Sequence, residues 1–181
     1  MEKKGIMSKD WHGIMKVLWI KHWRDGEVVW QQDNVRNLLH SDGESYVLRA
    51  CFTGGQTSSV IPENYYMGLD NRSELLASNT LDELVAEPTG NGYNRQAISS
   101  AGDFAVTLEG SNYRATSPIV AFRAEGGSWG PVQNVFLTNS ATETGTLISS
   151  AKLDTGVEVA DGDQVTMRIG IVLKDCPDDS T

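Results

Sequence analysis

The sequence predicts a mainly β protein: an antiparallel β-sandwich, jelly-roll-like, with one or two short helices and an N-terminal arm or hairpin. Two observations carry this prediction. The chain of 181 residues is long enough to bury a core of its own. Its second half holds β-rich runs separated by turns containing Gly, Asn, Asp or Pro, namely residues 104–108, 119–123, 132–138, 146–153 and 165–173. This spacing favours a sandwich or barrel over a βαβ scaffold.

The N-terminal segment is rich in tryptophan. Four of the five tryptophans precede residue 31: Trp11, Trp19, Trp23 and Trp30. An indole ring is too large and apolar to be left uncovered, so the segment packs on something. Its periodicity fits either a helix over residues 11–22 or a strand. The Asp25-Gly26 pair favours two strands, residues 17–24 and 27–32, joined by a type I′ turn.

The next forty residues mix helical and strand patterns. Residues 33–40 predict one or two helical turns that end near Gly43, and residues 44–52 fit either a continuation of that helix or a strand. Residues 53–59 contain two glycines and little that is apolar, which predicts a mobile loop. Residues 65–69 predict a strand.

A short helix is predicted just before the middle of the chain. Thr80 and Glu83 have the spacing of a capping box, in which each side chain satisfies a free backbone amide of the other. The helix would run over residues 81–86 and stop before Pro88. We divide the chain into an N-terminal arm and hairpin (1–32), a β-sandwich (33–174) and an acidic tail (175–181).

Residues 87–96 predict a fixed, exposed corner. A proline at position 88 is followed by Gly90 and Gly92 and then by Tyr93 and Arg95. Gly and Pro at these positions are typical of tight turns. Corners of this kind occur on binding and assembly surfaces more often than in reaction centres. We therefore expect Tyr93 and Arg95 to make packing or subunit contacts.

The charge is unevenly distributed. Residues 1–36 hold seven Lys and Arg against five Asp and Glu, whereas the rest of the chain holds eight against nineteen. Nucleic acid would repel so acidic a body, so we expect no nucleic-acid partner. The basic N-terminal segment either docks on an acidic partner or reflects uneven solvation alone. No apolar run has the length of a membrane span, and no signal peptide is evident. Cys51 and Cys176 fit either a single disulfide bridge or two separate thiols, and we expect the thiols.

Motifs for catalysis and metal binding are incomplete. Residues 126–130 match the G-x-S-x-G pattern of a nucleophile elbow, but no helix follows and the last histidine is His40. We interpret this stretch as a hairpin turn whose Trp129 covers a core edge. The histidines lack zinc-ligand spacing, and Asp161-Gly162-Asp163 fits a turn better than a weak calcium site. The sequence thus predicts no catalytic residue, no cofactor and no metal.

The order of several short motifs resembles a group of virion structural proteins of tailed bacteriophages. The motifs are KHWRDGE at 21–27, NLLHSDGE at 37–44, YMGL at 66–69, EPTGNGYNRQ at 87–96, WGPV at 129–132, FLT at 136–138 and GTLI at 145–148. Together they span most of residues 17–173. The resemblance implies a non-enzymatic particle component with no catalytic residues to transfer.

Within that group we expect a capsid decoration, or cement, protein. It would be made in the bacterial cytoplasm, sit on the capsid surface, bind the major capsid protein and itself, most simply as a trimer, and touch no membrane. Its interface would use the aromatic and cationic side chains of Trp11, Trp19, Trp23, Trp30, Tyr93 and Arg95. The alternatives are a tail or connector component, or a surface-displayed glycan-binding module that stacks sugars on rings such as Tyr93 and Trp129.

Overall fold

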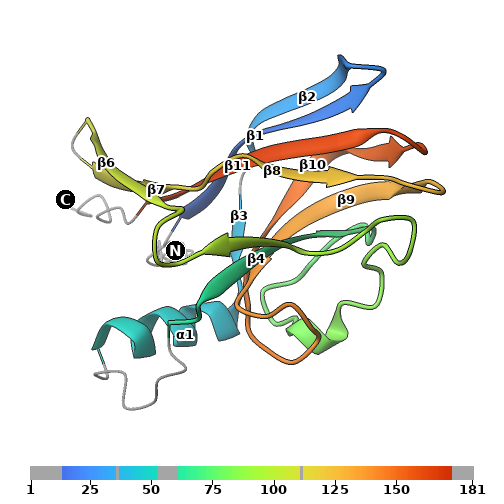
Figure 1. Cartoon of the computed structure of the whole chain (residues 1–181). Helices are drawn as coiled ribbons and strands as arrows, with labels where there is room; N and C mark the ends of the chain where they lie inside the picture. The colour runs from blue at the N-terminus through green and yellow to red at the C-terminus, as the bar shows by residue number, and fades with distance from the viewer. Residues whose placement is uncertain (1–13, 36, 53–60, 111, 173–181) are drawn as a thin grey trace, which may run out of the picture.

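The computed structural model describes residues 14–35, 37–52, 61–110 and 112–172. Two antiparallel β-sheets face each other and enclose the main core, with one α-helix at the end of the lower sheet (Figure 1). This confirms the predicted mainly β sandwich. The division into arm, sandwich and tail stays a prediction, since residues 1–13 and 173–181 lie outside the described part.

The first sheet has six strands. Its order is β2 (Glu27–Val35), β1 (Ile14–Arg24), β11 (Gln164–Val172), β7 (Asn112–Thr116) and β6 (Ala105–Glu109), and β8 (Val120–Arg123) also pairs with β11. β7 and β8 occupy successive stretches of the same edge of β11, because Val172 to Gly170 pair with β7 and Met167 to Gln164 pair with β8.

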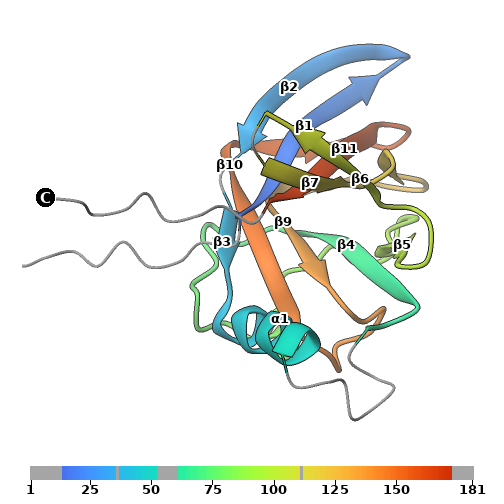
Figure 2. The ribbon, with the colours of Figure 1, turned by 90° about the vertical axis from the view of Figure 1, so that its left-hand side faces the viewer.

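The second sheet has five strands. Its order is β3 (Asn37–Leu39), β10 (Leu147–Val159), β9 (Trp129–Thr138), β4 (Asn64–Asp70) and β5 (Gln96–Ser99). Helix α1 (Ser41–Phe52) packs against β10, and a one-turn 3₁₀ helix (Leu81–Glu83) lies between β4 and β5 in the chain. Figure 2 shows the two sheets from the side, with α1 beneath them.

The predicted N-terminal hairpin is present. Asp25 and Gly26 both have positive φ values, 50° and 82°, as a type I′ turn requires. The matching twist lets β1 pair with β2 on one side and with β11 on the other. The hairpin is therefore an integral part of the six-stranded sheet (Figure 1).

The prediction of helical turns over residues 33–40 is wrong. Val35 ends β2, is buried in the core and pairs with Val17, and β3 follows at Asn37–Leu39. His40 N then donates to Ile148 O, and the helix begins only at Ser41. Pairing with distant strands outweighs the weak local preference here. The open choice for residues 44–52 resolves as helix, and the predicted loop at 53–59 lies outside the described residues.

The capped helix is present but shorter than predicted. It makes a single 3₁₀ turn over Leu81–Glu83 and does not continue to residue 86. The backbone N–H of Thr80 donates to the Glu83 carboxylate at 3.2 Å, as the capping-box spacing predicts. Leu81 and Leu84 anchor the turn in a second apolar cluster, and this packing fixes its length.

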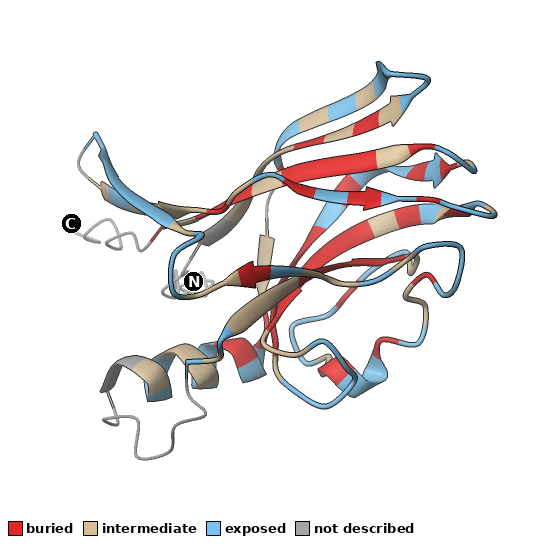
Figure 3. Ribbon diagram, viewed as in Figure 1, coloured by how far each residue is buried: buried red, intermediate tan, exposed pale blue. Residues whose placement is uncertain are grey.

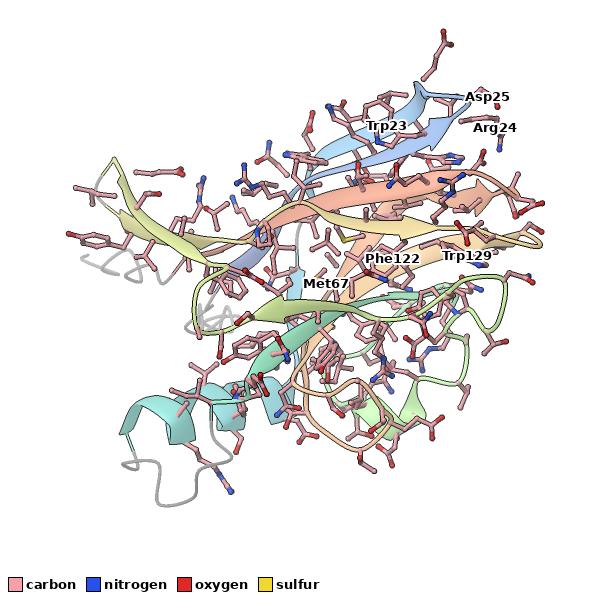
Figure 4. All side chains as sticks on the ribbon, viewed as in Figure 1. Trp23, Arg24, Asp25, Met67, Phe122 and Trp129 are labelled. Atoms are coloured by element: carbon pink, nitrogen blue, oxygen red, sulfur yellow. The ribbon has the colours of Figure 1, made fainter. Side chains whose placement is uncertain are left out.

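The main core lies between the sheets, and a second core lies outside one of them. Met67, Phe122 and Trp129 point into the space between the sheets (Figure 4). On the outer side of the five-stranded sheet a smaller cluster contains Leu75, Leu81, Leu84, Phe136 and Leu147. Strand β9 is thus buried on both faces over its second half, as Figure 3 shows in red. This explains its continuous apolar run.

A buried carboxylate joins the tip of the β1–β2 hairpin to the turn between β10 and β11. Asp163 is 3% exposed and accepts hydrogen bonds from Arg24 Nη2 at 2.7 Å and from His22 Nε2 at 2.7 Å. The backbone N–H of Ala160 donates to the same oxygen at 2.9 Å. The bonds from Arg24, with those from Ala160 and His22, hold the pKa of Asp163 well below its usual value of 3.8, although burial opposes them. The bonds from His22 and Arg24 to Asp163 fix the β1–β2 hairpin to the turn before β11.

This carboxylate is expected to contribute a pH-dependent part of the stability. Because its folded-state pKa is lowered, its contribution is fully present above the ordinary pKa of about 4 and is lost as the pH falls. The stability difference between the native protein and Asp163→Asn should therefore shrink between about pH 5 and about pH 2 in urea titrations. A difference that stays constant over this range would contradict the assignment.

Candidate functional site

The corner at residues 87–96 folds back onto the sandwich. Tyr93 Oη accepts a hydrogen bond from Leu69 N at 2.8 Å and donates to Glu87 Oε1 at 2.6 Å. Its ring stacks on Phe122, with centroids 6.0 Å apart, and meets Trp129 edge-on at 5.5 Å. Burial, with the Glu87 charge, raises the pKa of Tyr93 far above its usual range, so the phenol stays neutral.

Arg95 is also held inside the subunit. Its side chain is 5% exposed and forms a bidentate pair with Glu87, with Nη2 at 2.7 Å from Oε2 and Nε at 2.9 Å from Oε1. Its Nη1 donates to the backbone oxygens of Ser140 and Thr142. All three guanidinium nitrogens therefore have partners within the chain, and the group also lies 5.3 Å from the centroid of the Phe136 ring.

A glycine makes room for this stack. Gly68 on β4 pairs with Phe136 on β9, and a Cβ at position 68 would lie 2.1 Å from Phe136 Cζ. The ring therefore occupies the space of the missing side chain. The Phe136 ring lies between Gly68 and the guanidinium of Arg95, and that guanidinium pairs with Glu87. We call these four residues the arginine stack.

Several of the motifs that resemble phage proteins meet at this corner. YMGL supplies Gly68, FLT supplies Phe136, and WGPV supplies Trp129, whose Nε1 donates to Asn91 O at 3.1 Å. The structure thus places Tyr93 and Arg95 in packing contacts, which is one of the two roles expected for them. Within the corner, residues 89–92 and Asn94 are exposed.

The groups considered for chemistry take part in packing or in turns. Ser128 is exposed in a turn that leads from β8 in one sheet to β9 in the other, so the prediction of a hairpin turn is wrong. Trp129 is 4% exposed at the core edge, as interpreted from the sequence. His22 binds Asp163, and buried His40 lies 2.9 Å from Ser150 Oγ. In the described ranges no three His, Cys, Asp or Glu side chains are grouped as a metal would require. None of the described helices is long and apolar enough to cross a membrane.

The outer face of the six-stranded sheet carries a row of aromatic side chains. On β1, Ile20 and His22 point inward and are buried, so Trp19, Lys21 and Trp23 point outward. Lys21 Nζ lies 5.4 Å from the Trp19 ring and 6.0 Å from the Trp23 ring. We call Trp19, Lys21 and Trp23 the tryptophan face.

This face is only partly covered. Trp19 and Trp23 are half-buried, and Trp23 Nε1 donates to Thr166 Oγ1 at 2.8 Å. The five-stranded sheet has its second apolar cluster over its outer side. Over the tryptophan face, by contrast, no helix or loop of the described chain is seen (Figures 1 and 2).

The six residues expected at an interface do not form one surface. Trp19 and Trp23 share the outer face, whereas Trp30 pairs with His22 and packs against the main core from the other side. Tyr93 and Arg95 lie in the corner, and Trp11 is outside the described residues. Alternation along the predicted strand puts Trp19, Lys21 and Trp23 on one face, but only the tertiary structure decides that this face points outward.

Comparisons with known proteins place the chain in a family. No curated protein and no solved structure matches the chain. A family model described as "Podophage GP4 fiber I protein gp80" matches residues 46–173. The match begins within α1, ends after β11 and includes the corner with its arginine stack. Because the match covers more than two thirds of the chain, this protein belongs to the podophage GP4 fiber I protein gp80 family and is a structural protein of a phage virion.

Proposed function

We propose that the chain is a non-enzymatic fibre subunit of the phage particle that binds its neighbours through the tryptophan face. The family description, a fiber I protein, supports the fibre role. One observation supports binding through the tryptophan face. Its half-buried indoles lie on a sheet face that the described chain leaves uncovered.

The chemistry of this face suits a protein partner. Indole rings bury a large apolar area at a small cost in side-chain entropy, and tryptophans dominate the binding energy of many interfaces. Lys21 lies near both rings and adds a positive charge to a protein of negative net charge. The neighbours are other copies of the same chain, arranged as a closed oligomer such as a trimer, or another virion protein.

Head decoration is the second candidate. The broad outer face of the six-stranded sheet favours it, because such a face can lie against a shell of major capsid protein. In that case the same tryptophans would contact the capsid, and bridging of neighbouring capsomers would stabilise the head. The fibre role and the head role differ in the position of the protein on the particle. Both use the tryptophan face.

The double variant Trp19→Ala/Trp23→Ala is expected to reduce the copies built into particles at least about tenfold, because two interface tryptophans are lost. The measurement is quantitative mass spectrometry of purified virions from cells that express only the variant. Val85→Ala, at a position 86% exposed on another part of the surface, is the control and should leave incorporation unchanged. Normal incorporation of a folded double variant would contradict the tryptophan-face proposal.

Location separates the two roles. Cryo-electron microscopy of the particle at side-chain resolution should place the chain in fibre density with Trp19 and Trp23 at a contact. Density for the chain on the capsid lattice would support head decoration and exclude the fibre role. Density in which both indoles face solvent would exclude this face as the attachment surface.

A further inference from the structure

The β6–β7 hairpin reaches beyond the body of the sandwich. It forms the end of the six-stranded sheet and projects to one side (Figures 1 and 3). All five residues of β6 are exposed, and three apolar side chains of the hairpin are strongly so: Val106 at 65%, Leu108 at 59% and Tyr113 at 66%. Within the described chain, β6 pairs only with β7.

The three side chains share one face of the hairpin. Val106 pairs with Ala115 and Leu108 with Tyr113, so all four side chains point the same way. The other face is polar, with Thr107 opposite Arg114 and an ion pair between Arg114 and Glu109. The hairpin therefore has an uncovered apolar face beside an edge of unpaired backbone groups.

The other sheet edges are more strongly protected than the edge of β6. Natural proteins protect exposed edges with bulges, charges, proline or short strands. Edge strand β2 lies beside a bulge at His22/Trp23 and carries Glu27 and Asp33. Strands β3 and β5 have three and four residues. Strand β6, with the sequence AVTLE, is five residues long, carries its single charge at the end, on Glu109, and has neither proline nor lysine. Such an edge is suited to pairing with another strand.

The sequence of β6 is complementary to itself. In an antiparallel pair of two β6 strands centred on Thr107, Val106 faces Leu108 of the second copy and Ala105 faces its Glu109. This register pairs all five residues and keeps the two Glu109 carboxylates at opposite ends. A register centred on Glu109 would place those carboxylates directly opposite each other, which is unfavourable. The register centred on Thr107 also places the apolar faces of the two β6–β7 hairpins on the same side. They then form one continuous apolar surface across four strands, two from each copy.

We propose that strand β6 binds the β6 strand of a second copy of this chain, in an antiparallel pair with a two-fold axis at Thr107. The paired backbone groups supply affinity, and Val106 and Leu108 set the register. This contact is separate from the tryptophan face, so either can hold without the other. A two-fold contact links two subunits, whereas a trimer needs a different surface, so β6 would connect assemblies to each other.

Disulfide trapping tests the register directly. In the centred pair the Cβ atoms of the two Thr107 residues lie about 4.5–5.5 Å apart, close to disulfide range. Thr107→Cys in a Cys51→Ser/Cys176→Ser background should form a covalent dimer on mild oxidation. Ala105→Cys in the same background is the matched control and should give far less dimer, since it faces Glu109. Equal cross-linking of both variants, or none, would overturn the proposed register.

Charge exchange tests whether the occupant is a second copy. Val106→Glu/Leu108→Glu and Val106→Lys/Leu108→Lys place like charges opposite each other, so each variant alone should lose the two-fold contact in sedimentation or light scattering. An equimolar mixture of the two should regain it. The positions are exposed, so both variants should keep the circular dichroism spectrum of the native protein.

Two results would exclude self-pairing. One is a folded glutamate variant with the oligomeric state of the native protein. The other is a combination of two observations: the native protein does not self-associate, and the glutamate variant fails to enter particles. That combination would assign the β6 edge to a different virion protein. Neither result depends on Trp19 or Trp23, so the test is independent of the proposal for the tryptophan face.

Discussion

Replacing Arg95 with alanine is expected to lower the free energy of unfolding by about 3–5 kcal/mol, as for other broken buried ion pairs. The change removes the bidentate partner of Glu87, whose side chain is only 15% exposed. It also removes the donor that satisfies the backbone oxygens of Ser140 and Thr142. Chemical denaturation monitored by tryptophan fluorescence would measure the loss.

The matched control is Arg123→Ala. Arg123 and Glu125 are 65% and 67% exposed and lie 3.4 Å apart, so that pair should contribute less than about 1 kcal/mol. If the two alanine variants proved equally stable, the arginine stack would not hold the corner in place. If the double variant Arg95→Met/Glu87→Gln regained part of the free energy of unfolding, the loss in Arg95→Ala would be due to the unpaired Glu87 carboxylate.

Replacing Phe136 with alanine is expected to cost about 3–5 kcal/mol. The side chain is fully buried between Gly68 and the Arg95 guanidinium, and it belongs to the cluster over the outer side of the five-stranded sheet. Its loss would leave a cavity on β9, the strand paired with both β4 and β10. Urea unfolding gives the free energy, and the slope of the transition shows whether the folded state stays compact.

Gly68→Ala provides the coupled test. In the native background the new Cβ would meet the Phe136 ring at 2.1 Å, so overpacking should cost about 1–3 kcal/mol. In the Phe136→Ala background the ring is gone, and the same change should cost little. Gly102→Ala, where no atom lies within 4 Å of the added Cβ, is the control in both backgrounds. Additive losses would contradict a direct contact between the ring and Gly68.

The sequence predicted those strands that are marked by turn residues and by apolar alternation within the strand itself. The Asp25-Gly26 turn has two residues that tolerate positive φ, and the alternation on either side of it identifies the hairpin. The β-rich runs after residue 103 each overlap a strand of the structure, with ends that differ by up to six residues, at the end of β10. Strands β5 and β7 were missed because they are short and polar, and only pairing with β4, β6 and β11 makes them strands.

The role of the corner could not be predicted from the residues alone. From the sequence, Tyr93 and Arg95 follow two glycines in a turn and fit a packing contact as well as a subunit contact. Their burial depends on Leu69, Phe122 and Phe136, which are far away in the chain. The order of the motifs nevertheless indicated a phage structural protein, and the family match agrees with this.

The sequence by itself determined a β-sandwich with a tryptophan-rich hairpin, an acidic body and a resemblance to phage virion proteins. These properties depend on composition, local periodicity and turn residues, which are readable along the chain. Only the tertiary structure decided which side chains stay uncovered. Trp30 packs against the core while Trp19 and Trp23 face outward, and Val106 and Leu108 lie on an unpaired edge. Exposure depends on strand register and sheet order, which arise from contacts between residues far apart in the chain.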